Sequence, residues 1–209
     1  RVITSIILIA IVLNCLFINS FSWLLLLTIV SFICWFEFII LVKKIWKRKT
    51  ITIVPIILSF IFLIIFIFTA YGYRIEEGAV GILFVLGICI FSDIGGYIIG
   101  KSIGGKKLTK ISPNKTISGS FGSFLFSLLP LGILMILGFK EDFSVKIILF
   151  CLLISLACQI GDLIISYFKR LAKVKDTGKI LPGHGGMLDR IDGVIFAIPS
   201  TIIIQPLVF

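Results

Sequence analysis

Residues 51–71 read ITIVPIILSFIFLIIFIFTAY, a stretch without a single charged side chain. A helix needs roughly 20 apolar residues to cross the hydrocarbon core of a bilayer, where it satisfies its own backbone hydrogen bonds. Runs of comparable length occur at 2–19, 21–42, 51–71, 79–99, 119–138, 145–168 and 191–208. The pattern predicts an all-α polytopic integral membrane protein with about seven transmembrane helices. We expect the first run to be retained, because no small-residue cleavage site follows it.

The composition supports a membrane protein and argues against a nucleic-acid partner. The chain is 59% hydrophobic and 14% charged, whereas soluble domains are about 45–50% apolar and about 25% charged. The net charge of +10 therefore indicates membrane topology and attraction to phosphates. The five cysteines all lie inside apolar runs without paired spacing, so we interpret them as packing residues.

Basic residues gather in alternate loops. Segments 43–50, 101–118 and 169–190 hold five, five and six Lys or Arg residues. The intervening loops 71–78 and 139–146 balance their basic residues with acids. Cytoplasmic loops carry the excess of Lys and Arg in membrane proteins, so the pattern predicts a cytoplasmic N-terminus.

Three acids fall within the expected spans, namely Glu37, Asp93 and Asp162. A carboxylate inside a membrane is costly and is by default a functional hypothesis. A hydrogen bond between helices or a protonated acid is the alternative for Glu37 and Asp93. Asp93 precedes Lys101 by eight residues and Asp162 precedes Lys169 by seven. At about 1.5 Å per residue, both acids lie roughly 10–12 Å inside the cytoplasmic end of their helices.

Two more acids, Asp189 and Asp192, open the last apolar run and share one helical face. Clustered carboxylates below a basic surface need a neutralising cation. Oxygen ligands near phosphates suit Mg²⁺, which can bridge acids to an anionic substrate. We therefore expect Mg²⁺ as the cofactor, and a second cation remains an open alternative.

Residues 95–102, GGYIIGKS, match the phosphate-binding pattern G-x-x-x-x-G-K-[ST]. That motif works between a strand and a helix, with its backbone wrapped around phosphates. Here it coincides with the end of an expected span, and no βαβ pattern surrounds it. We reject it and expect Lys101 to reach the interface or a phosphate on its own.

The most polar stretch is 166–192, SYFKRLAKVKDTGKILPGHGGMLDRID, which holds the only histidine. Its pattern resembles the signature of the phosphatidate cytidylyltransferase (CDP-diacylglycerol synthase) family through Ser166, Lys169, Arg170, Lys175, Asp176, Pro182, His184, Gly185, Gly186, Asp189, Arg190 and Asp192. The family's second conserved region is similar to Asp93, Tyr97, Gly100, Gly104, Lys107, Leu108, Ile111, Ser112, Pro113, Lys115, Thr116 and Gly119, and its early tryptophan–glutamate pair is similar to Trp35 and Glu37. The chain departs from the family at Lys101, Ile103 and Ser118, where the family usually has Arg, Phe and Glu, and its first half is short.

The resemblance implies an enzyme that joins CTP to phosphatidic acid, giving CDP-diacylglycerol and pyrophosphate. It implies one membrane-embedded domain over 1–209, with N-terminal spans in 1–78 and catalytic spans and loops in 79–209. It further implies a homodimer in the bacterial inner membrane, with the active site facing the cytoplasm.

The resemblance also assigns roles to residues. The expected catalytic residues are Asp162, Asp189, Lys169, Arg170, Lys175, Asp176, His184 and Arg190. The expected substrate-binding residues are Asp93, Tyr97, Lys107, Ser112, Lys115, Ser166, Gly185 and Gly186. The expected Mg²⁺ ligands are Asp162, Asp189 and Asp192. A loop hydrogen bond is the alternative role for His184, and a local ion pair with Lys175 is the alternative for Asp176.

Two other classes of function compete with this one. A different membrane enzyme acting on phosphates is one; a CDP-alcohol phosphotransferase is disfavoured because VIFAI follows Asp192-Gly193 in place of a D-G-x-x-A-R cluster, and a CTP-dependent lipid-alcohol kinase stays open. A transporter would bind ions at mid-membrane and commonly carries inverted repeats. The acids here lie nearer one face, and no repeat is evident.

Overall fold

The computed structural model describes residues 2–46, 49–109, 111–138, 144–178, 180 and 185–209. These residues form two compact units. Unit 1 comprises Arg1–Ala79 and Tyr167–Asp192, and unit 2 comprises Val80–Ser166 and Gly193–Phe209. We describe each unit by itself, and the expectation of one domain over 1–209 stays a prediction.

Helices dominate both units. Their bounds are α1 Val2–Ile18, α2 Ser20–Ile45, α3 Lys49–Glu76, α4 Gly78–Ile103, α5 Ile117–Phe126, α6 Leu129–Ile136, α7 Val145–Leu171, α8 Leu188–Ile191 and α9 Val194–Val208. Within the described ranges, six helical segments are long and apolar enough to cross a membrane, with α5–α6 and α8–α9 each counted as one. Helix α1 is apolar but has only 17 residues. The all-α membrane fold is thereby confirmed, with α1 as a short candidate for the seventh span.

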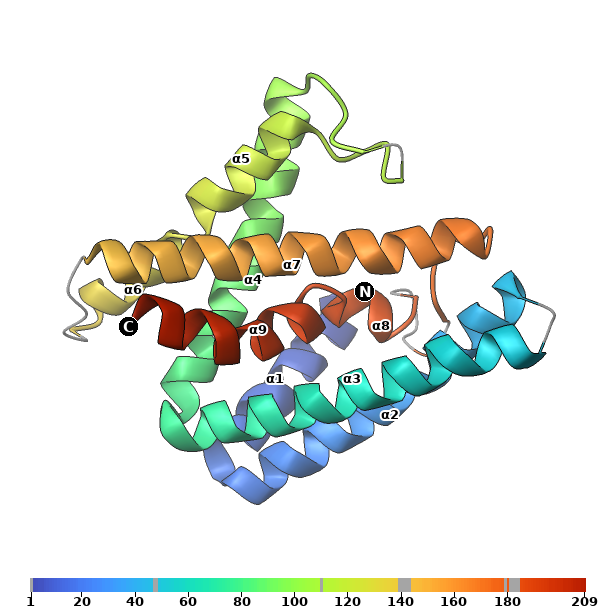
Figure 1. Cartoon of the computed structure of the whole chain (residues 1–209). Helices are drawn as coiled ribbons and strands as arrows, with labels where there is room; N and C mark the ends of the chain where they lie inside the picture. The colour runs from blue at the N-terminus through green and yellow to red at the C-terminus, as the bar shows by residue number, and fades with distance from the viewer. Residues whose placement is uncertain (1, 47–48, 110, 139–143, 179, 181–184) are drawn as a thin grey trace. The chain divides into compact units, whose positions relative to one another are not determined.

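In unit 1 the first three helices follow one another closely (Figure 1). Asn19 separates α1 from α2, and its side chain accepts a hydrogen bond from the Ser22 amide at 2.7 Å. This N-cap satisfies one of the otherwise unpaired amides of the first helical turn. The indole of Trp23 donates to the Ala70 carbonyl at 3.2 Å, which ties α2 to α3.

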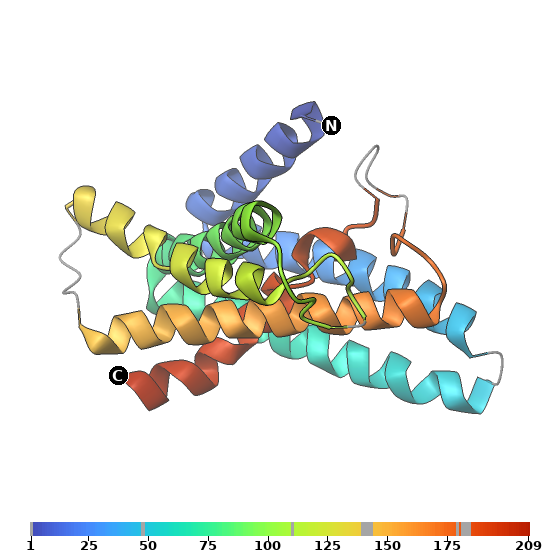
Figure 2. The ribbon, with the colours of Figure 1, turned by 90° about the horizontal axis from the view of Figure 1, so that it is seen from above.

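In unit 2, α5 lies beside the C-terminal half of α4, as Figures 1 and 2 both show. Small residues form the seam between them. A Cβ on Gly122 would meet the Ile99 Cβ at 2.5 Å, and one on Gly119 would meet the Gly96 carbonyl oxygen at 2.8 Å. Glycine lets the two backbones approach closely, as is common between membrane helices. This close approach sets the position of the loop that joins α4 to α5.

Residues 95–102 lie within α4, which continues to Ile103. They are helical, so the rejection of a phosphate-binding loop there is confirmed. The Lys101 ammonium lies 3.4 Å from the Tyr97 hydroxyl and 5.6 Å from the centre of its ring. Both side chains are exposed at the end of the helix.

Four of the five cysteines are buried, namely Cys34, Cys89, Cys151 and Cys158. Cys158 on α7 lies directly against Gly193, where a Cβ would meet the Cys158 carbonyl oxygen at 3.1 Å. The prediction that the cysteines serve packing is thus confirmed for this helix crossing.

Candidate functional site

In unit 1, the intramembrane acid Glu37 holds a distant loop. Its side chain is 1% exposed. Oε1 accepts a hydrogen bond from the Met187 amide at 3.1 Å. Oε2 accepts from the Leu188 amide at 2.9 Å and from the Thr177 hydroxyl at 3.1 Å. Of the roles open to Glu37, the structure therefore shows a hydrogen-bonding one, directed to the loop between α7 and α8.

Asp189 is the second carboxylate bonded to this loop. Its Oδ1 accepts from the Lys169 ammonium at 2.8 Å. Its Oδ2 accepts from the Thr177 amide at 2.7 Å, the Thr177 hydroxyl at 3.0 Å and the Gly186 amide at 3.2 Å. A carboxylate offers about four lone-pair sites, and four donors approach this one. Its side chain is 8% exposed, so the chain itself satisfies Asp189.

Thr177 connects the two acids. It is 4% exposed, and its hydroxyl lies within hydrogen-bonding distance of both Glu37 and Asp189. A hydroxyl carries one proton, so it donates to one of these acids at a time. The sequence analysis missed Thr177, because a threonine between Asp176 and Gly178 looks like any polar loop residue. No local signal reveals that two distant carboxylates converge on it.

Two glycines allow this convergence. A Cβ on Gly186 would meet the Gly178 amide at 2.8 Å and Oε2 of Glu37 at 2.5 Å. A Cβ on Gly178 would meet the Glu37 carboxyl carbon at 2.7 Å. Neighbouring Gly185 has φ +87°, a conformation that favours glycine. The glycines at 178 and 186 thus allow the backbone to approach the carboxylate of Glu37 closely.

The remaining predicted residues of unit 1 lie nearer solvent. The exposed residues among them are Arg170, Lys175, Asp176 and Arg190. Asp192 is partly exposed and follows the last residue of α8. His184 lies outside the described residues, so its predicted role stays a prediction.

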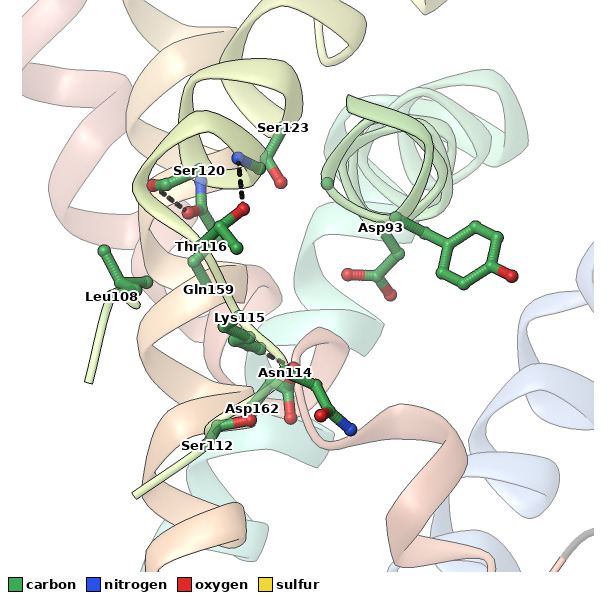
Figure 3. Close-up of a pocket in the computed structure, with 13 residues that line it drawn as sticks. Asp93, Leu108, Ser112, Asn114, Lys115, Thr116, Ser120, Ser123, Gln159 and Asp162 are labelled. Atoms are coloured by element: carbon green, nitrogen blue, oxygen red, sulfur yellow. Dashed lines mark hydrogen bonds and ion pairs between the residues drawn. The ribbon is translucent and has the colours of Figure 1, made fainter. Parts of the chain in front are cut away.

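Unit 2 contains a pocket of about 340 Å³ between α4, α7, the start of α5 and the loop before it. Figure 3 shows Asp93 reaching toward it from α4, and Asp162 from α7. The predicted residues that line it are Asp93, Tyr97, Ser112, Lys115 and Asp162. The pocket thus brings together two of the three intramembrane acids and one lysine.

Lys115 forms an ion pair with Asp162 (Figure 3). Both side chains are 28% exposed. Asp162 also lies 3.2 Å from the Ser166 hydroxyl, which donates to it. Ser166, predicted as a substrate-binding residue, is buried beside this acid. Lys115 and Ser166 thus both donate to Asp162, which also lines the pocket.

The backbone of the α4–α5 loop places Lys115. The Leu108 amide donates to the Lys115 carbonyl at 2.8 Å, and the Ile117 amide donates to the Lys106 carbonyl at 3.0 Å. These bonds accompany an isolated antiparallel bridge between Lys107 and Thr116. The loop is therefore a short hairpin that returns Lys115 to the pocket, while Lys107 is exposed.

Ser118 occupies the position where the resembling family usually has Glu. Its hydroxyl donates to the Gly104 carbonyl and lies 2.9 Å from the Thr116 hydroxyl. Thr116 in turn accepts from the Gly119 amide at 3.0 Å as the N-cap of α5. Ser118 thus links Gly104, near the start of the α4–α5 loop, to Thr116 at its end.

A chain of hydrogen bonds leads from the pocket into the helix packing. Ser120 donates to Gln159 Oε1 at 2.6 Å, and Gln159 Nε2 donates to Ser155 Oγ at 3.3 Å. The Ser155 and Ser92 hydroxyls lie 2.8 Å apart and are 0% exposed. This chain links α5, α7 and α4 behind the pocket. The sequence analysis did not select Gln159 or Ser120.

The predicted metal ligands divide between the units. Asp162 belongs to unit 2, whereas Asp189 and Asp192 belong to unit 1. Within either unit, the described residues do not bring three His, Cys, Asp or Glu side chains together. The three-acid set therefore stays a prediction. The pocket does supply oxygen donors of the kind that Mg²⁺ prefers.

Comparison with known proteins points to one family. The model of the cytidylyltransferase family matches residues 40–207. A phosphatidate cytidylyltransferase of Helicobacter pylori J99 is 41% identical over 141 residues, which are 67% of this chain and 52% of that protein. A phosphatidate cytidylyltransferase of Staphylococcus aureus COL is 46% identical over 127 residues, which are 59% of this chain and 48% of that protein. The chain spans about half the length of the curated relatives it matches.

Proposed function

The chain belongs to the cytidylyltransferase family, and from this membership we propose that it transfers a cytidylyl group from CTP to phosphatidic acid. The products are CDP-diacylglycerol, a precursor for phospholipid biosynthesis, and pyrophosphate. The observation that carries the proposal is the 41% identity to a relative named phosphatidate cytidylyltransferase. The matched family segment, 40–207, contains both the unit 2 pocket and the loop bonded to Glu37.

The reaction makes one bond and breaks one. A phosphate oxygen of phosphatidic acid attacks the α-phosphorus of CTP, and the bond from that phosphorus to the β-phosphate oxygen breaks. The lipid phosphate is already an anion, so a strong general base is not required. Catalysis then depends on positioning and charge stabilisation, as in phosphoryl transfer generally.

The basic residues supply that stabilisation in this proposal. Lys115 lies in the pocket with Asp162. Lys169 is oriented by Asp189 at 2.8 Å. Arg170 and Arg190 are exposed and can bind phosphate oxygens in a bidentate manner. The acyl chains of the lipid remain in the bilayer in this arrangement.

We propose Mg²⁺ as the cofactor, held by Asp162 with Asp189 and Asp192 as further ligands. When bound, the ion neutralises phosphate charge. The partly exposed carboxylate of Asp162, in a pocket that Asp93 also lines, supports this assignment. Asp189 fits less readily, because a metal there displaces a donor such as Lys169.

Removal of the metal tests the cofactor directly. EDTA should reduce conversion to background, because the phosphate charge is then no longer neutralised. Excess Mg²⁺ should restore conversion. Full activity in buffer stripped of divalent cations would rule out the cofactor.

The location of the site is also a proposal. The alternation of basic and balanced loops supports an active site on the cytoplasmic face of the inner membrane. The resemblance supports a homodimer, which mass measurement of the detergent-solubilised protein can test.

The decisive experiment for the function uses CTP labelled in two positions. Membranes containing the chain are supplied with phosphatidic acid and with CTP carrying label in either the α- or the γ-phosphate. Label from the α-phosphate should enter the lipid phase, and label from the γ-phosphate should appear in soluble pyrophosphate. Transfer of the γ-label to lipid would instead indicate a CTP-dependent kinase. No label in lipid from either position would overturn the proposal.

A further inference from the structure

Residues on both sides of segment 178–186 are hydrogen-bonded to the carboxylate of Glu37. Thr177 bonds Glu37 before segment 178–186, and Met187 and Leu188 bond Glu37 after it. The predicted His184, Gly185 and Gly186 lie within this segment. One side chain on α2 therefore contacts Thr177, Met187 and Leu188, which all lie within the signature stretch 166–192.

The burial of Glu37 indicates that these bonds matter. A carboxylate that is 1% exposed is strongly disfavoured unless hydrogen bonds compensate for its lost hydration. Both oxygens of Glu37 receive backbone amides from the same turn, and Oε2 also faces the hydroxyl of Thr177. The glycines at 178 and 186 leave room for this acid and for no Cβ.

The same contacts continue to the charged groups of the proposed reaction. The Thr177 amide fixes Oδ2 of Asp189 at 2.7 Å, and Oδ1 of Asp189 holds the Lys169 ammonium at 2.8 Å. The Gly186 amide adds a further donor to Oδ2 at 3.2 Å. The order of contacts is thus Glu37, Thr177, Asp189 and Lys169. Glu37 and Thr177 thus connect α2 to Asp189, and Asp189 in turn holds the Lys169 ammonium, a group suited to bind phosphate.

We propose that Glu37 and Thr177 are positioning residues, which hold the backbone at Met187 and Leu188 and thereby orient Asp189 and Lys169 for cytidylyl transfer. The inference rests on the proposed function. Neither side chain touches the reacting atoms in this proposal. They act through the carboxylate of Asp189 and the backbone of 186–188.

A conservative substitution series at Thr177 tests the proposal. Thr177→Val keeps the shape and the amide but removes the hydroxyl, whereas Thr177→Ser keeps the hydroxyl. Loss of a group that orients a ligand residue typically lowers activity by about 10–100-fold. We expect Thr177→Val to lower kcat within this range and Thr177→Ser to retain most of it. Thr69→Val is the matched control, because the buried Thr69 hydroxyl donates to the Phe66 carbonyl of its own helix, at 3.0 Å.

Binding of labelled CTP separates positioning from simple unfolding. The number of CTP sites per purified chain should stay unchanged in Thr177→Val, so kcat per CTP site falls. An unchanged kcat per site would overturn the proposal, and so would a loss of CTP sites in parallel with activity. CTP sites without any lipid product in the unsubstituted chain would instead refute the proposed function.

Limited proteolysis tests the hydrogen bonds of Glu37 without reference to activity. Glu37→Gln replaces an acceptor oxygen by a donor that cannot bond backbone amides. Trypsin cleavage after the exposed Lys175 should therefore be faster in Glu37→Gln than in the unsubstituted chain, at a temperature where both remain folded. Equal cleavage rates would overturn the positioning role of Glu37.

Discussion

Asp162 and Asp189 look alike in the sequence, but their surroundings differ. Asp189 is 8% exposed and lies within hydrogen-bonding distance of the Lys169 ammonium, the Thr177 amide and hydroxyl and the Gly186 amide. Asp162 is 28% exposed, pairs with Lys115 and lines a pocket of about 340 Å³. One acid is largely buried among donors from α7 and from the loop that follows it, and the other is partly exposed in a pocket.

The two acids, both predicted as Mg²⁺ ligands, therefore lie in different surroundings. A carboxylate held by several donors has a fixed orientation and orients its partners in turn. A partly exposed carboxylate with one lysine can exchange that lysine for a cation or a substrate group. Within unit 1, Asp189 is thus tied to Lys169 and Thr177, whereas within unit 2 Asp162 lines a pocket.

The largest effects should come from removing either charge. Asp162→Asn and Asp189→Asn should each lower CTP-dependent conversion by about 100–1000-fold, the range for losing a key electrostatic group. Their stabilities should differ. Asp189→Asn leaves Lys169 largely buried without its counter-ion, which costs about 3 kcal/mol, whereas Asp162→Asn should leave the thermal midpoint nearly unchanged.

Thermal unfolding in detergent, measured beside the labelled-CTP assay, checks this pair of variants. Equal loss of stability in both would break the comparison, because the two acids would then be equivalent structural groups. Wild-type-like turnover in either variant would remove that acid from the proposed metal site.

An intermediate effect is expected at Lys115. Lys115→Gln removes the cation that pairs with Asp162 in the pocket. We expect KM for CTP to rise by about tenfold, corresponding to about 1.4 kcal/mol, with a smaller change in kcat. Lys106→Gln is the matched control, since Lys106 is exposed in the same loop. An equal rise in KM for Lys106→Gln would show that the loop acts only through its overall charge.

The smallest effect is expected at Ser118. Ser118→Ala removes the hydroxyl that donates to the Gly104 carbonyl and should cost about 1 kcal/mol of stability. Activity should fall by no more than about threefold, since the hairpin bonds of Lys106 and Leu108 remain. Loss of activity comparable to that of Lys115→Gln would move Ser118 from the base of the loop into the substrate site.

Many residues of the candidate site could be predicted from the sequence, but the hydrogen bonds between them could not. The apolar runs predicted the long helices, and the charges of an otherwise apolar chain marked Asp93, Asp162 and Asp189. Lys115 was selected from the resemblance, and the structure brings it to Asp162. Thr177, Ser120 and Gln159 were missed, because an uncharged polar residue gives no local sign of a partner distant in the sequence.

The sequence by itself determined that this chain is helical and spans a membrane, because about 20 apolar residues in a row have no other stable form in a bilayer. It also determined the family, since the signature is a matter of residue order and spacing. Only the tertiary structure decided which donors each acid contacts. The role of Glu37 depends on donors at Thr177, Met187 and Leu188. A hydrogen bond requires its donor and acceptor to lie close in space. Only the folded chain brings Thr177, Met187 and Leu188 next to Glu37, because they are about 140–150 residues away in the sequence.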